Sequence, residues 1–325
     1  MLRGSRPFSP FPLFPLSHSP ALPLSHLLLL SPAPEGRASS QSGETPRPES
    51  GIPRCACLPL VVAVLLVGAG CAAPWKRPGA EPSLRFDLEG SLKYGPVTGF
   101  AQTPRGGAPG TTSPNRPTFR QLGIDEVLIP DASVGLRWRG HGLYSGGSWI
   151  RLDGQTTLDT TLISQGTTFP AGTAVNSEVR LDWYRLGYKY RFALANEMGE
   201  TFALSPAAGV ALLDFDYRLN GEGLLANRSY IVGTPQMGLE VEWIPSGRIS
   251  VVGGSLSSLP EVSNLFLLSA RLDCRCRLWG TARRGGMLFL GVGYEWINYE
   301  DNQTRPNHVK ADAGPLLRFG LQTHF

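Results

Sequence analysis

The sequence predicts an all-β protein: a closed, antiparallel, up-and-down transmembrane β-barrel of about ten strands, with eight strands as the alternative. Three observations lead to this fold. Apolar and polar residues alternate in segment after segment from residue 84 to the C-terminus, and a period of two places successive side chains on opposite faces of a strand. The connections between these segments alternate between short and long. Charged residues make up only 17% of the 325 residues, which excludes disorder over most of the chain.

Three segments precede the predicted barrel, which comprises residues 84–325. Residues 1–53 are rich in Pro, Ser and Leu and have no regular periodicity, which is typical of a disordered extension or a misassigned start. Residues 54–70 contain the apolar run LPLVVAVLLVGAG, which is too short to cross a bilayer as a helix but suits an export signal. Residues 71–83 are Pro-rich and charged, so they are expected to form a tether.

The export segment ends in GAGC, residues 68–71, and resembles a bacterial lipoprotein signal. Cleavage of such signals leaves a cysteine that carries lipid, so the resemblance implies lipidation of Cys71. The sequence departs from the family at Gly68, where Leu, Val or Ile is usual. The alternative is an ordinary signal peptide cut nearby, for instance after residues 71–73. Both alternatives export the chain.

The strand pattern begins in LRFDLEGSLKY, residues 84–94, where alternate positions are apolar and charged. Two later segments lose the alternation midway. In SEVRLDWYRLGYKYRFAL a bulge near Trp183 would restore a single apolar face, and TFALSPAAGVALLDFDYRL has a similar slip before Leu213. The ten expected strands lie at or near residues 84–94, 132–140, 142–152, 177–194, 201–219, 236–243, 248–256, 267–279, 287–299 and 308–325.

The connections fall into two groups. Tight turns are expected at 140–142, 195–200, 245–247 and 280–286. Long Gly- and Pro-rich loops are expected at 101–131, 153–176, 219–229, 257–265 and 300–308. Short turns on one rim and long loops on the other resemble the layout of bacterial outer-membrane barrels, with both chain ends on the short-turn side.

Two barrels fit alternating strands. A lipocalin-like, lipid-anchored ligand-binding barrel would enclose its apolar face around a cavity, whereas a membrane barrel turns that face toward lipid. Strands of eleven to eighteen residues favour the membrane barrel, because a tilted crossing needs roughly 9–11 residues. The aromatic residues Trp138, Trp183, Trp243, Tyr294 and Trp296 are expected to form interfacial girdles on that outer face.

The last eight residues, RFGLQTHF, resemble the signal by which the barrel assembly machinery recognises outer-membrane barrels. The resemblance rests on Arg318, Gly320 and the closing Phe325, and the sequence departs from the family at Thr323. It implies an outer-membrane location, contact with outer-membrane lipid and the assembly machinery as a partner.

With the apolar face outward, the charged face lines the lumen. A barrel this narrow is filled by long side chains, and the mixed charges predict an ion-pair network that plugs it, with a narrow pore as the alternative. The expected network consists of Arg85, Asp87, Glu89, Arg137, Arg139, Glu240, Glu242, Arg271, Asp273, Arg275, Glu295, Asp312 and Arg318. Lys93, Arg277 and Lys310 are expected to face the lumen with them.

Some barrels of this size are enzymes, so an outer-membrane hydrolase is also considered. Asp214 and Asp216 near one loop and His308 near another could activate water. The resemblance to omptin proteases rests on these residues alone, and an enzyme is the less favoured interpretation. The formal charge of +4 forms no basic stripe, so no nucleic-acid partner is expected, nor any cofactor or metal. The sequence predicts a structural or surface-exposed barrel and leaves activity and oligomeric state open.

Overall fold

The computed structural model describes residues 84–104, 116–196, 200–259, 263–280 and 284–325. The predicted extension, export signal and tether, including Cys71, lie outside the described residues. None of the helical segments that the structure describes has the length and apolar character of a membrane-spanning helix.

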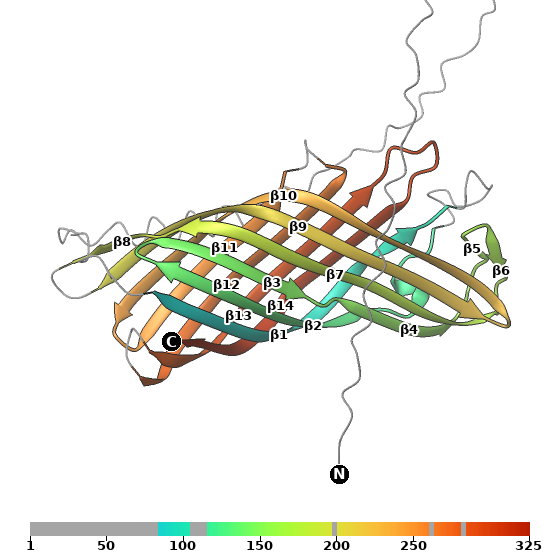
Figure 1. Ribbon diagram of the computed structural model, residues 1–325. Helices are drawn as coiled ribbons and strands as arrows, with labels where there is room; N and C mark the ends of the chain where they lie inside the picture. Colours follow the sequence, from blue (N-terminus) through green and yellow to red (C-terminus); the bar gives the residue numbers. More distant parts are fainter. Residues whose placement is uncertain (1–83, 105–115, 197–199, 260–262, 281–283) are drawn as a thin grey trace, which may run out of the picture. The chain divides into compact units, whose positions relative to one another are not determined.

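Twelve of the described strands form one antiparallel sheet that closes on itself (Figure 1). β1 pairs with β14, and Phe86 and Phe325 exchange both backbone hydrogen bonds at 3.1 and 2.9 Å, so closure uses the last residue of the chain. β3 and β4 together make one position in the wall, as do β7 and β8, because each pair shares the same neighbouring strand. The described sheet therefore has ten positions, which confirms the predicted ten-stranded barrel.

The strands around the barrel are β1 (Arg85–Gln102), β2 (Glu126–Trp138), β3 (His141–Ser148), β4 (Arg151–Thr157), β7 (Ala174–Tyr190), β8 (Phe192–Ala195), β9 (Thr201–Gly221), β10 (Leu224–Ser246), β11 (Ile249–Ser258), β12 (Leu265–Gly280), β13 (Gly285–Glu300) and β14 (His308–His324). A separate hairpin, β5 (Leu162–Ser164) with β6 (Thr167–Phe169), and the short 3-10 helix η2 (Arg120–Leu122) lie in the long connections.

The prediction of a long loop at 219–229 is wrong. β9 and β10 instead form one continuous hairpin whose turn residues, Glu222 and Gly223, have φ angles of 50° and 80°. Two left-handed residues match the right-handed twist of a two-residue β-turn, and glycine adopts this conformation without strain. The polar residues that suggested a loop lie on the outward face of two long strands, of 21 and 23 residues.

Side-chain polarity reverses partway along the strands. On the outward face of β9, Val210 and Leu212 are about half exposed, whereas Asp214 and Asp216 follow on the same face. On the inward face the side chains change from polar to apolar in the same direction, and Leu213 is fully buried there. The barrel therefore has a short-turn half with an apolar outside and a long-loop half with an apolar inside.

The reversal replaces the bulge predicted near Trp183. β7 pairs with β9 without a register shift from Asn176 to Lys189, so no extra residue is inserted. Trp183 points inward and is 2% exposed, while Tyr184 and Leu186 point outward. The prediction that Trp183 belongs to an outer girdle is therefore wrong: the apolar residues change sides at this level because their surroundings change.

In the short-turn half the predicted assignment of sides is confirmed. Val292 and Phe319 are each 49% exposed, whereas Glu295 and Arg318 are 3% and 1% exposed. The outward apolar side chains form a band that we call the outer belt. Its exposed members are Phe86, Leu88, Tyr94, Leu128, Val134, Leu136, Trp138, Leu143, Tyr184, Leu186, Tyr188, Phe192, Leu194, Val210, Leu212, Met237, Trp243, Ile249, Leu278, Leu288, Leu290, Val292, Leu317, Phe319, Leu321 and Phe325.

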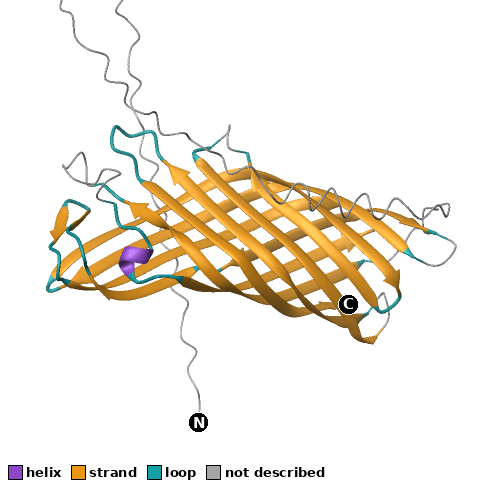
Figure 2. Cartoon of the chain, turned by 180° about the vertical axis from the view of Figure 1, so that it is seen from behind, coloured by secondary structure: helices purple, strands orange, loops and turns teal. Residues whose placement is uncertain are grey.

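The long-loop half is filled by its own loops, at the end where Figure 2 shows the turn of helix. Phe119, which precedes η2, Leu122 of η2 and Phe169 of β6 are fully buried against the inward residues of the wall. The hydroxyl of Ser177 donates to the carbonyl of Leu122 at 3.1 Å, which ties the η2 segment to β7. We call this filling the apolar plug.

The apolar plug gives a testable expectation for Phe169. Replacing this fully buried ring in Phe169→Ala should destabilise the protein by about 3–5 kcal/mol, because the cavity left behind cannot collapse completely. The loss is measured as a lower temperature for conversion of the folded to the unfolded band in detergent gels. Ile231→Ala is the control, since that side chain is 70% exposed. Equal shifts in both variants would show that the hairpin does not contribute to the core.

Candidate functional site: the charged lumen

Glu89 of β1 is the centre of the charged lumen. Its carboxylate accepts hydrogen bonds from Arg271 at 2.7 Å, Arg318 at 2.6 Å and Arg275 at 3.2 Å. The three guanidinium groups come from β12 and β14, so this one carboxylate links strands that close the barrel. Charge-assisted bonds of this number offset the cost of removing the carboxylate from water.

Asp273 provides a second carboxylate on the same level. It is fully buried, accepts from Arg318, and lies 3.4 Å from Arg275. The Arg318 guanidinium also lies 4.4 Å from the centre of the Phe289 ring, where the face of the ring attracts a cation. Arg318 is thus held on three sides.

A third layer lies where the lumen meets the apolar plug. The ammonium of Lys93 donates to Glu295 at 2.6 Å and to Asp131 at 3.2 Å. Asp131 also accepts from Arg185 at 3.0 Å and from the hydroxyl of Ser148 at 2.5 Å. These residues come from five of the ten wall positions, so the layer connects half of the strands around the barrel.

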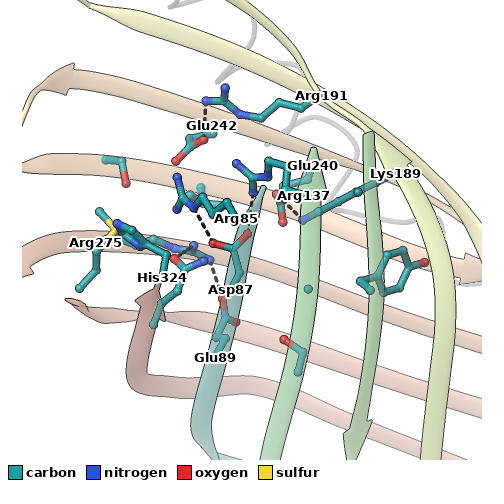
Figure 3. A pocket seen from close by; sticks show the side chains of 18 of the residues that line it. Arg85, Asp87, Glu89, Arg137, Lys189, Arg191, Glu240, Glu242, Arg275 and His324 are labelled. Atoms are coloured by element: carbon teal, nitrogen blue, oxygen red, sulfur yellow. Dashed lines mark hydrogen bonds and ion pairs between the residues drawn. The ribbon is translucent and has the colours of Figure 1, made fainter. Parts of the chain in front are cut away.

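Toward the short-turn rim the ion pairs are more open (Figure 3). Glu240 accepts from Arg271 at 2.6 Å and from Lys189 at 3.4 Å. Glu242 accepts from Arg191 at 3.0 Å. The side chains in these two groups are about one quarter exposed, in contrast to the buried layers above.

Asp87 is the carboxylate on β1 nearest the rim. It pairs with Arg85 at 2.8 Å and with Arg137 at 3.4 Å. A cavity of about 260 Å³ occupies this part of the lumen, and a second cavity of about 110 Å³ lies beside Lys93 and Arg318. Charged side chains line both cavities, which is the opposite of the apolar cavity that the lipocalin-like alternative requires.

Two residues predicted for the network do not join it. Arg139 lies in the turn after β2 with a φ of 58° and is exposed, and its guanidinium stacks over the outward Trp138 at 4.8 Å. Asp312 faces outward, opposite Trp296 and Thr98, and so does Lys310, two residues before it on the same strand. β14 has one extra residue relative to both neighbours just after Ala313, and this bulge inverts the alternation that the prediction had extended through it.

Four members of the network were not predicted. Asp131 falls in the long loop predicted at 101–131, whereas β2 begins earlier, at Glu126. Arg185, Lys189 and Arg191 follow the apparent break in β7, where the expected bulge obscured the parity. The signal was present, since the outward Tyr184, Leu186, Tyr188 and Tyr190 alternate with the inward basic residues.

The candidate catalytic residues are not brought together. Asp214 and Asp216 lie on the outward face of β9, and His308 begins β14, on the opposite side of the ring of strands. His308 is within 3.7 Å of Glu300 and bonds Asn298 at 3.0 Å, and its burial lowers its pKa against the opposing effect of Glu300. No nucleophile or second histidine lies among these contacts. Among the described residues no group of three His, Cys, Asp or Glu could hold a metal ion.

The residues of the C-terminal signal have clear local positions. Arg318 is buried in the ion-pair network and Phe325 is 63% exposed in the outer belt. A side chain on Gly320 would meet the Gly90 carbonyl at 2.2 Å and the Phe289 ring at 2.5 Å, so only glycine fits there. These are structural reasons for the motif, and its recognition by assembly machinery stays a prediction.

No protein-family model and no curated protein matches this sequence. Among solved structures, the outer-membrane protease OmpT from Escherichia coli is 10% identical, with a TM-score of 0.38 and coverage of 76% of this chain and 99% of that chain. The attachment invasion locus protein Ail of Yersinia pestis is 9% identical, with a TM-score of 0.31 over 74% and 99%. Neisserial surface protein A is 11% identical, with a TM-score of 0.26 over 76% and 100%. At these scores the similarity does not extend to function.

The central position of Glu89 predicts a large effect of its loss. Glu89→Gln removes the charge that three arginines share, and breaking a buried pair in this way costs about 3–5 kcal/mol. The measurement is the urea midpoint of the refolded protein in lipid vesicles. Glu178→Gln is the matched control, because its pair with Arg180 is on the outer wall and partly exposed, where the loss is about 1 kcal/mol or less. A similar loss in the two variants would contradict the central role of Glu89.

Proposed function

We propose that the protein is a surface-exposed structural barrel of the bacterial outer membrane whose lumen is closed to free diffusion. The single observation that carries this proposal is the reversal of side-chain polarity at one level of the wall. The short-turn half, with an apolar outer surface and a charged lumen, suits a lipid environment. The long-loop half, with a polar outer surface and an apolar core, suits water. The same strands meet both conditions in succession, as a barrel does when it rises out of a bilayer.

The dimensions of the outer belt support this proposal. On β9 the apolar outward face runs from Phe202 to Leu212, a span that matches the roughly 9–11 residues of a tilted membrane crossing. Closure through β1 and β14 pairs the first and last strands of the barrel, so neither exposes an edge that hydrocarbon would penalise by several kcal/mol per group. Trp138 and Trp243 at the short-turn border and Tyr184 at the other border have the positions of interfacial girdles.

Export and anchoring remain part of the proposal. The apolar segment at 54–70 would direct export, and Cys71 would carry lipid at the start of a tether leading to the first strand. The barrel assembly machinery would insert the chain, with Phe325 as part of its signal. Separating the two alternatives for Cys71 requires mass spectrometry of the mature N-terminus, where lipid on Cys71 adds fatty-acyl mass and an ordinary cleavage does not.

If the outer belt lies in a membrane, two matched substitutions should destabilise the protein to different extents. Leu290→Arg places a charge in the belt and should destabilise the protein in lipid vesicles by about 2–4 kcal/mol. Ile231→Arg places the same charge opposite Asp214, above the belt, and should cost less than about 1 kcal/mol. Urea titrations in vesicles measure both.

Cell fractionation provides the complementary readout for the same pair. Wild-type protein and Ile231→Arg should be found in the outer-membrane fraction and show heat-modifiable migration, while Leu290→Arg should be depleted there. Wild-type protein in the soluble fraction without a heat shift would refute the membrane position.

The closed lumen predicts electrical silence. The apolar plug fills the long-loop half and ion pairs cross the short-turn half, so the purified wild-type protein should show no single-channel steps in a planar bilayer. A stable, defined conductance would instead establish the narrow-pore alternative. Heat-modifiable migration of the same preparation serves as the control that the tested protein is folded.

A further inference from the structure

The cavity of about 260 Å³ reaches the short-turn rim of the lumen. Gly247 and Arg248, in the turn between β10 and β11, line it at the rim, and Glu89 lines its inner end. We call this cavity the vestibule. Side chains from opposite sides of the ring point into it (Figure 3), so an occupant would be contacted from several strands at once.

The lining of the vestibule is strongly unbalanced in charge. Among the described residues, eight arginine and lysine side chains line it, against four carboxylates. Clefts lined by one sign of charge with low-dielectric walls concentrate the potential and raise the local concentration of the opposite ion. A structural ion-pair network alone does not require such an excess, because neutral side chains would fill the same space without repulsion.

The four carboxylates are already engaged. Glu89 accepts from three arginines, and Glu240 and Asp87 each pair with two cations. Glu242 pairs with Arg191. All four carboxylates of the lining therefore already have a cationic partner.

Arg277 of β12 carries part of that excess. It forms no ion pair with any residue that the structure describes. Its Nε atom is buried without a hydrogen-bond partner, although a guanidinium offers five donors. A buried donor without an acceptor is costly, and an anion in the vestibule would supply the acceptor.

We propose that the vestibule is a binding site for a compact anion that carries one or two phosphate or sulfate groups. Guanidinium forks match the oxygen spacing of such groups and bind them through paired hydrogen bonds. The volume of about 260 Å³ is below the 300–1,000 Å³ typical of drug-sized ligands, so the ligand is small. The inference rests on the lumen alone and does not depend on where the barrel resides.

The probe is inorganic pyrophosphate, titrated into the full-length protein folded in an uncharged detergent and followed by calorimetry. Orthophosphate and sulfate are tested in parallel, and sodium chloride at matched ionic strength is the reference. We expect saturable binding with a stoichiometry of one and a higher affinity for pyrophosphate than for either single anion. Absence of binding above the chloride reference would overturn the proposal.

Three variants test whether binding occurs in the vestibule. Arg277→Gln should weaken pyrophosphate binding roughly tenfold or more, since it removes a charged donor. Glu242→Gln should strengthen binding, because a competing carboxylate is lost from the same cavity. Arg218→Gln changes a half-exposed arginine on the outer wall and should leave the affinity unchanged.

Heat-modifiable migration establishes that each variant is folded before titration. If Arg277→Gln fails to fold, Arg277→Lys retains the charge without the fork and should weaken binding to a smaller extent. Unchanged affinity in the Arg277 variant, or equal weakening by Arg218→Gln, would overturn the assignment to the vestibule.

Discussion

In a closed antiparallel barrel every side chain of a strand points either into the barrel or away from it. Either face can be polar or apolar, depending on what it contacts. Closure between β1 and β14 pairs the first and last strands of the barrel, so the remaining choice is made by the surroundings of the side chains. In this protein those surroundings change along the barrel axis. The charged lumen, the apolar plug and the outer belt all follow from that change, since each strand must reverse its polarity at the same level to satisfy both halves.

The two halves fill the interior by different physical means. In the long-loop half, Phe119 and Phe169 enter from loops and pack as an ordinary apolar core. In the short-turn half, long charged side chains from the wall occupy the space instead. Lys93, Glu295 and Asp131 lie at the junction, where each charge has at least one opposite partner within 3.2 Å. Burial is tolerated there because the pairs come from rigid neighbouring strands and need little ordering.

Much of the fold could be predicted from the alternation alone. Strand number, closure and the sides of the belt depend on parity, which the sequence contains directly, as in residues 84–94. The alternation does not show whether a given face of a strand meets lipid, water or the interior of the barrel. The polarity reversal in β7 was therefore read as a bulge, which misplaced Trp183 and obscured Arg185. The true bulge, in β14, went unseen for the opposite reason: Ala311 and Leu317 are both apolar, so the pattern looked continuous although Asp312 had changed sides.

Charges along the lumen are closely paired where they are buried and less closely paired near the rim. A buried surplus charge costs most where water is excluded, which is why Glu89 and Asp273 are surrounded by several arginines and Arg318 is almost fully buried only in their company. Near the rim the side chains are about one quarter exposed, so water screens an excess of like charge and repulsion is weaker. Arg277, which forms no ion pair among the described residues, lies in the vestibule toward this rim, where a surplus charge costs less than in the buried layers but an anion would still stabilise it. Stability and ligand access thus favour the same end of the lumen.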